Sequence, residues 1–132
     1  MILADTSVLI DYLKGRQTQS AQKLSQVIES ALPFGISPII YQELLQGCAS
    51  LKEFDRLKHY LDTQIFYDLL KGRDSYAEAA KIYWKCRNRG VTIRSTIDCL
   101  IAQTALENNL FLLHNDVDFT RIQKVIPSLK LY

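Results

Sequence analysis

The sequence has few cysteines and histidines, the residues that build disulfide-bonded or zinc-stabilised folds. Its 132 residues include three cysteines, Cys48, Cys86 and Cys99, which are odd in number and show no Cys-x-x-Cys spacing. This pattern predicts neither a disulfide framework nor a zinc site. The two histidines, His59 and His114, do not form a spaced zinc pair either. We therefore expect the cysteines to be reduced and to lie in an ordinary apolar core.

Long apolar segments are also missing. The longest uninterrupted apolar run near the end of the chain is Leu110 to Leu113, whereas a bilayer span needs roughly 20 residues. The N-terminal segment has no basic stretch before its apolar residues and reaches an acid at Asp5, which is not the pattern of a secretory signal. The sequence thus predicts a cytoplasmic protein without a membrane partner.

A large excess of one charge is absent too. Sixteen basic and fourteen acidic residues give a net charge of +2, which is too small to indicate a nucleic-acid partner by itself. Residues 71–94 nevertheless hold seven basic and two acidic residues. This run is interpreted either as a phosphate-facing surface or as the solvated face of a helix.

The chain does contain a regular alternation of short apolar strands and amphipathic helices, without repeats or low-complexity linkers. In the helix expected near residues 74–89, an aromatic-rich stripe containing Tyr76, Tyr83 and Trp84 is predicted to face inward. The patterns predict one α/β domain spanning residues 1–132, with a mostly parallel sheet covered by helices on both faces. The expected strands are 2–4, 34–36, 65–67, 91–93 and 110–114, and the expected helices are about 8–15, 19–32, 38–47, 51–61, 74–89 and 96–108, followed by a short helix and an edge strand.

Four acidic residues lie close to the ends of predicted strands. Asp5 directly follows one strand and Asp116 comes two residues after the end of another, whereas Glu43 and Asp98 lie in the first two turns of helices that follow strands. The carboxyl ends of parallel strands share one edge of a sheet, so these four side chains are expected to meet. Taken singly, Asp5, Asp98 and Asp116 are also explained as helix caps and Glu43 as a solvent-facing side chain.

Clustered carboxylates repel one another, which raises their pKa values and lowers stability unless a cation is bound. Ligation by oxygen atoms alone suits Mg²⁺ or Mn²⁺ rather than zinc. Ala102 and Ala105 follow Asp98 at helical spacing, so that the helix backbone can approach the sheet closely. The four acids therefore predict a site for a divalent metal ion.

These residues resemble the motifs of PIN-domain nucleases, and most of all those of the VapC toxins of prokaryotic toxin–antitoxin pairs. The resemblance spans nearly the whole chain and rests on four motifs in order: MILADTSVLID at 1–11, SPIIYQEL at 37–44, DCLIA at 98–102 and HNDVDF at 114–119. It implies a three-layer α/β/α sandwich and a Mg²⁺- or Mn²⁺-dependent endoribonuclease whose metal ligands are Asp5, Glu43, Asp98 and Asp116. It also implies a homodimer, and a toxin–antitoxin hetero-oligomer in which the tail of a VapB-like antitoxin occupies the acidic pocket.

The fourth motif departs from the pattern of the relatives. They often have a threonine two residues before the acid, where this chain has His114, and Asp118 is an alternative to Asp116 as the fourth acid. The expected reaction is hydrolysis of an RNA phosphodiester by a metal-activated water. A basic rim for the RNA is expected from Lys14, Arg16, Arg73, Arg87, Arg89 and Arg94.

Two other functions fit part of the pattern. A phosphatase that uses Asp5 as its nucleophile usually has a second acid at the next-but-one residue, which here is Ser7. A catalytically inactive PIN-like module that binds RNA or protein would keep the fold without the chemistry. The helices between Pro38 and Leu61 offer an apolar groove, either for a partner helix or for dimerisation.

Overall fold

The computed structural model describes residues 1–132 and is built around a five-stranded sheet in the order β3-β2-β1-β4-β5. Each neighbouring pair is parallel, which confirms the predicted parallel sheet. The central strand β1 places Leu3 opposite Gly35 of β2 and opposite Leu112 of β4. The strands are β1 (Ile2–Ala4), β2 (Phe34–Ile36), β3 (Ile65–Phe66), β4 (Phe111–Leu113) and β5 (Lys130–Leu131).

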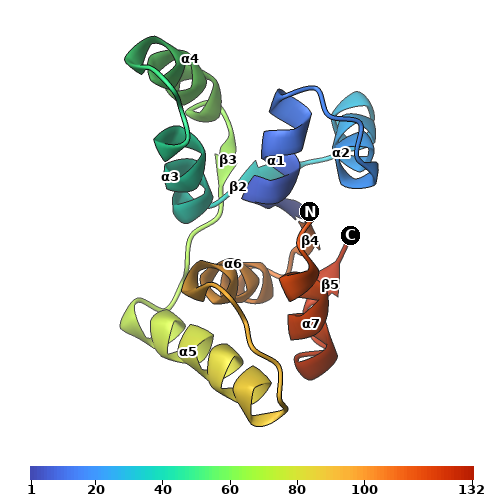
Figure 1. The fold of residues 1–132 in the computed structure, drawn as a ribbon, viewed down its shortest axis with the longest axis vertical. Helices are drawn as coiled ribbons and strands as arrows, with labels where there is room; N and C mark the ends of the chain where they lie inside the picture. Colours follow the sequence, from blue (N-terminus) through green and yellow to red (C-terminus); the bar gives the residue numbers. More distant parts are fainter.

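Seven helices cover the two faces of the sheet. The chain moves in one direction across the sheet from β1 to β3 and in the other from β4 to β5. Because crossovers between parallel strands are right-handed, this reversal places the two groups of helices on opposite faces. Figure 1 shows α1 to α4 above the sheet and α5 to α7 below it, which confirms the three-layer arrangement. The helices are α1 (Thr6–Leu13), α2 (Gln19–Glu29), α3 (Pro38–Gln46), α4 (Leu51–Leu61), α5 (Arg73–Asn88), α6 (Thr96–Glu107) and α7 (Val117–Val125).

The reversal also opens a crevice between the carboxyl ends of β1 and β4. The connection after β1 leaves toward β2 and the connection after β4 leaves toward β5, so the two loops diverge. The backbone N–H of Asp5 donates to the carbonyl of Leu113 at 2.9 Å and aligns the two strand ends. Side chains from the N-terminal and C-terminal parts of the chain therefore meet at this crevice.

Polar side chains at helix starts and apolar side chains in the middle explain why these elements form. Six of the helices begin at a residue whose side chain accepts a hydrogen bond from a backbone N–H of the first turn: Asp5, Thr18, Ser37, Ser50, Ser95 and Asp116. The core joins Leu3 and Leu112 of the sheet to Leu24 of α2 and Phe119 of α7, all fully buried. None of the helices has the length and apolar character that crossing a membrane would require.

The predicted strand at residues 91–93 is wrong. α5 ends at Asn88, the chain then turns at Gly90, whose φ is +74°, and the N–H of Val91 donates back to the carbonyl of Cys86. Only a few irregular residues then precede Ser95, the N-cap of α6, and the five strands of the sheet leave this segment no partner. Asp98 thus follows an irregular connection rather than a strand.

The inward stripe predicted for α5 is wrong for Tyr76 and Trp84, whereas Tyr83 is half-buried and packs against the core. The helix buries Ser75, Ala79, Ile82 and Cys86, whereas Tyr76 and Trp84 are 59% and 54% exposed. Small side chains on the buried face allow α5 to pack closely against α6. Tyr76 and Trp84 are left on the outside of the molecule.

Candidate active site

Asp5 is the buried centre of the crevice between β1 and β4. It is 4% exposed and accepts hydrogen bonds from the backbone N–H of Ser7 at 3.1 Å and from the Ser7 hydroxyl at 2.6 Å. That hydroxyl in turn accepts the N–H of Asn115 at 2.9 Å, so Ser7 links the loop after β1 to the loop after β4. Burial raises the pKa of Asp5 in spite of these bonds. The residue is both the N-cap of α1 and a carboxylate whose charge is destabilised by its surroundings.

Glu43 reaches the same crevice from α3. Ser37 caps this helix and Pro38 occupies its first turn, so α3 begins directly at the end of β2. The hydroxyl of Thr6 donates to Oε1 of Glu43 at 2.9 Å. Burial, together with the negative charge of Asp5, raises the pKa of Glu43. Glu43 is therefore a half-buried residue of the crevice and not a freely solvated side chain.

Three more carboxylates converge from the first turn of α6 and the start of α7. Oxygen atoms of Asp98, Asp116 and Asp118 all lie within 4.8 Å of one another. Burial, and then the negative charges of Asp116 and Asp5, raise the pKa of Asp98 to about 7. No hydrogen bond lowers it. A cation bound next to Asp98 would therefore stabilise its charged form.

Asp116 and Asp118 are held in different ways. The side chain of Asp116 is 29% exposed, and Oδ1 accepts the N–H of Asp118 and Nη2 of Arg94, each at 3.0 Å. The side chain of Asp118 is 1% exposed and accepts Nε of Arg94 at 3.0 Å and Nη1 of Arg121 at 3.1 Å. Burial acts to raise the pKa of Asp118, but the bonds from the two arginines lower it overall. Asp116 is therefore the more open carboxylate and Asp118 the more fully neutralised one.

His114 supports the backbone of Asp116. Its Nδ1 accepts the N–H of Asp116 at 3.2 Å, and its ring packs edge-on against Phe119 with 5.3 Å between the ring centres. Burial lowers the pKa of His114, which favours the neutral ring that this hydrogen bond requires. The histidine thus provides a polar contact to the loop that carries Asp116.

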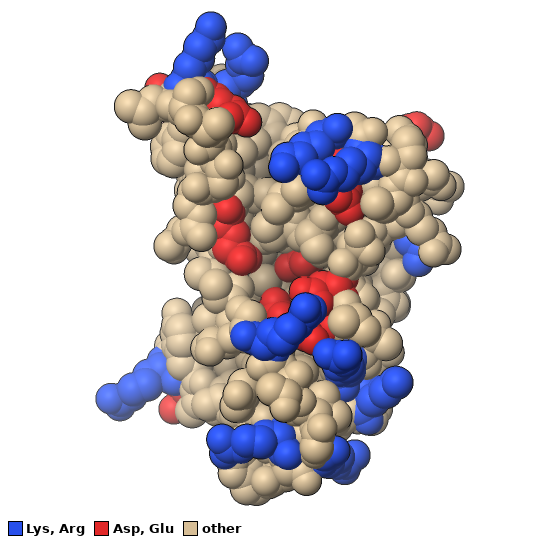
Figure 2. All heavy atoms as spheres, in the orientation of Figure 1, with Lys and Arg blue, Asp and Glu red and all other residues tan.

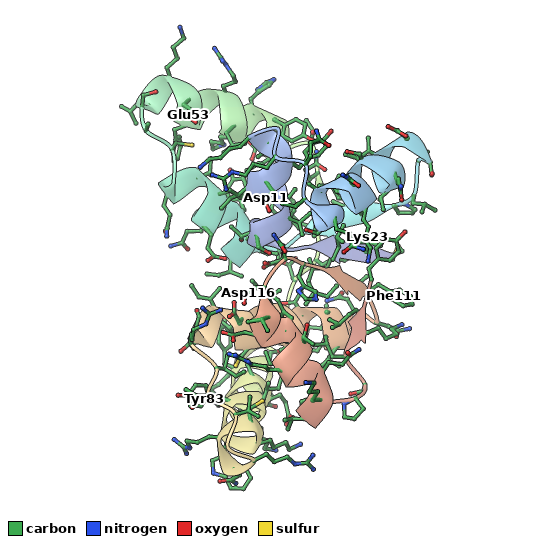
Figure 3. The ribbon with its side chains drawn as sticks, turned by 45° about the vertical axis from the view of Figure 1, so that its right-hand side comes forward. Asp11, Lys23, Glu53, Tyr83, Phe111 and Asp116 are labelled. Carbon is green, nitrogen blue, oxygen red and sulfur yellow. The ribbon has the colours of Figure 1, made fainter.

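The acidic side chains gather in the hollow between the two helical layers, with lysine and arginine side chains above and below them (Figure 2). All four acids named from the sequence face this crevice: Asp98 and Asp116 belong to the cluster, and the charges of Asp5 and Glu43 act on Asp98. Figure 3 shows Asp116 where the two layers meet, below Asp11 of α1. Asp5, Glu43 and Asp116 reach the crevice from the ends of strands, as the sequence pattern predicts, whereas Asp98 reaches it from an irregular connection.

The pairing of Asp118 with Arg94 and Arg121 was not expected from the sequence. A second acid two residues after Asp116 and an arginine just before the Asp98 helix are visible in the sequence, but their contact depends on the folded structure. The basic rim is also less free than expected, since Arg16 pairs with Asp11 at 3.3 Å and Arg87 lies over the ring of Tyr83 at 5.8 Å.

The atoms that the crevice offers as metal ligands suit a hard divalent cation. They are carboxylate oxygens, while the nearby ring of His114 is already hydrogen-bonded. A cation next to Asp98 would offset the repulsion that raises its pKa. The crevice thus has the chemistry of a site for a hard divalent cation, at the cluster formed by Asp98, Asp116 and Asp118.

Comparisons with known proteins agree with this arrangement. Ribonuclease VapC11 of Mycobacterium tuberculosis is 29% identical over 126 residues, which cover 95% of this chain and 93% of the relative. The structure of VapBC2 from Rickettsia felis bound to a DNA fragment from its promoter matches with a TM-score of 0.75 and 21% identity, covering 100% of this chain and 98% of that one. VapBC-1 from nontypeable Haemophilus influenzae matches with a TM-score of 0.71 and 26% identity, covering 100% and 97%.

The family assignment rests on a match to a family model and not on any single relative. The family model described as PIN domain matches residues 2–125. That range includes every strand except β5 and all seven helices, and it contains all the carboxylates of the crevice. The chain therefore belongs to the PIN domain family.

Proposed function

We propose that residues 1–132 form a single catalytic domain that acts as a divalent-metal-dependent endoribonuclease, the toxin of a VapBC-type toxin–antitoxin pair. The observation that carries this proposal is the meeting of Asp98 and Asp116 in an oxygen-only cluster, under the influence of Asp5 and Glu43. Relatives named VapC ribonucleases, and solved VapBC complexes of the same fold, support the same activity here.

Mg²⁺ or Mn²⁺ is the proposed cation, and Asp5, Asp98 and Asp116 are its proposed ligands. When bound, such an ion polarises the scissile phosphate and lowers the pKa of an attacking water. Asp98 has free lone pairs because it accepts no hydrogen bond, and Ser7 holds the Asp5 carboxylate in one orientation. The protein thus presents fixed negative oxygens on one side of the substrate phosphate.

Glu43 is proposed to orient the attacking water or a second ion. Thr6 holds Oε1 at 2.9 Å, which leaves Oε2 to accept a hydrogen bond from the water. Because the nucleophile is water and not the RNA 2′-hydroxyl, the products carry 5′-phosphate and 3′-hydroxyl ends. Asp5 is not a phosphatase nucleophile in this scheme, since Ser7 donates to it and cannot serve as the general acid such enzymes need.

The test measures cleavage of a labelled RNA by the purified protein with Mg²⁺ or Mn²⁺. We expect Asp5→Asn and Asp98→Asn to lower the rate by about 100-fold or more, because each weakens the charge that holds the ion. Asp55→Asn is the matched control, since Asp55 is an exposed acid on α4. Cleavage that survives chelation, or an Asp5→Asn variant that cleaves at the wild-type rate, would refute the proposal. RNA binding without cleavage by the wild type would instead favour the inactive binding module.

The antitoxin is proposed to bind a groove beside the crevice. This groove lies between α1, α3 and α4, has a volume of about 510 Å³ and includes Glu43 in its wall. Its apolar lining residues are Ile10, Leu13, Leu44, Leu57 and Tyr60, together with Cys48. A VapB-like protein could therefore place the apolar face of a helix in the groove and its tail in the crevice. Leu57→Glu is expected to weaken capture of the antitoxin encoded beside the toxin, with RNA cleavage unchanged.

The outward stripe of α5 is proposed to be the homodimer interface. Tyr76 and Trp84 are exposed on one helical face, and Tyr83 lies next to them, well away from Asp116 (Figure 3). Exposed aromatic side chains grouped in this way are typical of surfaces that another chain covers. Light scattering should find a dimer for the wild type and a monomer for the Tyr76→Lys, Trp84→Lys double variant. A dimer that survives both changes would place the interface elsewhere.

A further inference from the structure

We propose that Arg94 is a resident counter-cation that competes with the metal ion for Asp116 and thereby sets the metal affinity of the crevice. The inference rests on the proposed role of Asp116 as a ligand. Nη2 of Arg94 lies 3.0 Å from Oδ1 of Asp116, and Nε lies 3.0 Å from Oδ2 of Asp118. One guanidinium thus bridges two of the three clustered carboxylates.

The two ends of this bridge differ in how easily they can open. Asp118 is almost fully buried and also accepts the backbone N–H of Arg94 and a hydrogen bond from Arg121. The bond between Nη2 and Asp116 lies at the exposed side, where Arg94 is the only arginine that pairs with Asp116. The Asp116 end can therefore open while Asp118 keeps Arg94 anchored.

A metal ion and the guanidinium of Arg94 compete for the same carboxylate oxygen atoms. Asp98 and Asp116 are close enough to bind one ion, but an ion bound there would lie next to the positive charge on Nη2, and like charges at contact distance repel strongly. The side chain of Arg94 is 65% exposed, so Nη2 has room to turn outward. Metal binding thus requires the loss of the ion pair between Arg94 and Asp116, and this loss lowers the affinity of the crevice for the metal ion.

The test measures Mn²⁺ and Mg²⁺ binding by calorimetry without RNA. Arg94→Gln is expected to lower the metal dissociation constant about three- to fivefold, the size expected for an ion pair at the surface. It should also lower the melting temperature of the metal-free protein and enlarge the rise that metal produces. Arg94→Lys keeps the charge but cannot bridge both carboxylates with a planar fork, so its dissociation constant should fall between those of the wild type and Arg94→Gln.

Arg87→Gln is the matched control for charge. Arg87 lies over the ring of Tyr83 and forms no ion pair, so its removal should leave metal affinity within about 1.5-fold of the wild type at moderate salt, since exposed charges at a distance are screened. If Arg94→Gln binds metal no more tightly than the wild type, the proposal is overturned. Tightening of equal size in Arg87→Gln would overturn it as well, because the effect would then be one of net charge.

Asp116→Asn separates this proposal from the proposed function. If Asp116→Asn keeps wild-type metal affinity, Asp116 is not a ligand and both proposals lose that residue. If Asp116→Asn loses metal binding while Arg94→Gln is unchanged, only the role of Arg94 fails. In the Asp116→Asn background, adding Arg94→Gln should no longer tighten metal binding. The side chain at position 116 then lacks the negative charge for which Arg94 and the metal ion compete.

Discussion

The hydroxyl of Thr6 donates to the carboxylate of Glu43 across 2.9 Å and joins the first residue of α1 to α3. The two residues lie 37 positions apart in the chain. They come from the connections that follow two neighbouring strands, β1 and β2. This bond fixes one oxygen of Glu43 and leaves the other without a hydrogen bond from the protein.

Thr6→Val should therefore impair catalysis more than folding. Loss of one partly buried hydrogen bond is expected to lower the unfolding free energy by about 1 kcal/mol. The cleavage rate should fall roughly tenfold, because Glu43 no longer holds its orientation, while metal affinity stays nearly constant. Thr6→Ser retains the hydroxyl and should restore the rate. Equal rates for all three proteins would show that Thr6 has no positioning role.

Asp98→Asn should stabilise the metal-free protein. The substitution removes a carboxylate that burial and the neighbouring acids Asp116 and Asp5 destabilise. We expect a gain on the order of 1 kcal/mol at pH 8, allowing for screening by solvent. The same variant should lose the stabilisation that Mg²⁺ or Mn²⁺ gives the wild type. Chemical denaturation with and without metal tests both effects, and a less stable metal-free variant would contradict the argument.

The stability of the metal-free protein should depend on pH in a specific direction. The pKa of Asp98 is about 7 in the folded protein against 3.8 for the free side chain. Between these values the folded state binds the additional proton, so the contribution of Asp98 to stability falls as pH rises from about 4 to 7. The raised pKa values of Asp5 and Glu43 act in the same direction.

His114 acts in the opposite direction, because burial lowers its pKa and its contribution falls when pH drops below its ordinary value of 6.5. The contribution of Asp98 is obtained by subtracting the unfolding free energy of Asp98→Asn from that of the wild type at each pH. Bound metal should flatten this difference and release protons near pH 6. A difference profile without slope between pH 4 and 7 would be inconsistent with the crowded carboxylates.

Glu107 is expected to matter for stability alone. Its carboxylate accepts the N–H of Leu70 at 2.7 Å, the hydroxyl of Ser75 at 3.0 Å and the amide of Gln103 at 2.7 Å. It thereby ties the segment before α5 to α6. Glu107→Gln places a donor among these donors and should lower the unfolding free energy by about 1–3 kcal/mol.

The matched control for Glu107 is Glu78→Gln. Glu78 forms an exposed ion pair with Lys81 at 3.2 Å, so its loss should change stability by less than about 0.5 kcal/mol. Metal affinity should be unchanged in both variants. A drop in metal affinity for Glu107→Gln would mean that the contact between α5 and α6 also shapes the crevice.

Much of the fold could be predicted from local signals. Ser37 and Ser95 each begin a helix at the residue where the sequence pattern places its start, whereas the first helix begins at Thr6, two residues before its predicted start. The buried strands are short apolar runs between such caps, and the parallel order follows from their alternation with helices. The grouping of acids at one sheet edge could be anticipated because strand ends converge there.

The errors arose where packing between elements decides the outcome. Residues 91–93 have the composition of a strand but lack a neighbouring strand to pair with. α5 has two candidate faces, and the one with small side chains is buried, which exposes Tyr76 and Trp84. No periodicity in the sequence distinguishes these faces, because the choice depends on how closely α6 approaches.

The arginine contacts were beyond sequence reasoning for a different reason. Arg94 and Asp118 are 24 positions apart, and the arginine-rich region offers several alternatives of equal charge. Only the folded connection before α6 brings one particular guanidinium to Asp116 and Asp118. Charge composition predicts that some basic groups surround the crevice but does not identify the one that enters it.

The link from Ser7 to Asn115 bears on when the protein becomes active during its own synthesis. Asn115 is made 108 residues after Ser7, and Asp98 also comes from the last third of the chain. A nascent polypeptide on the ribosome therefore carries Asp5 and Glu43 before it contains Asp98 and the other carboxylates that complete the crevice. The crevice therefore cannot form until the chain has been synthesised at least as far as Asp116.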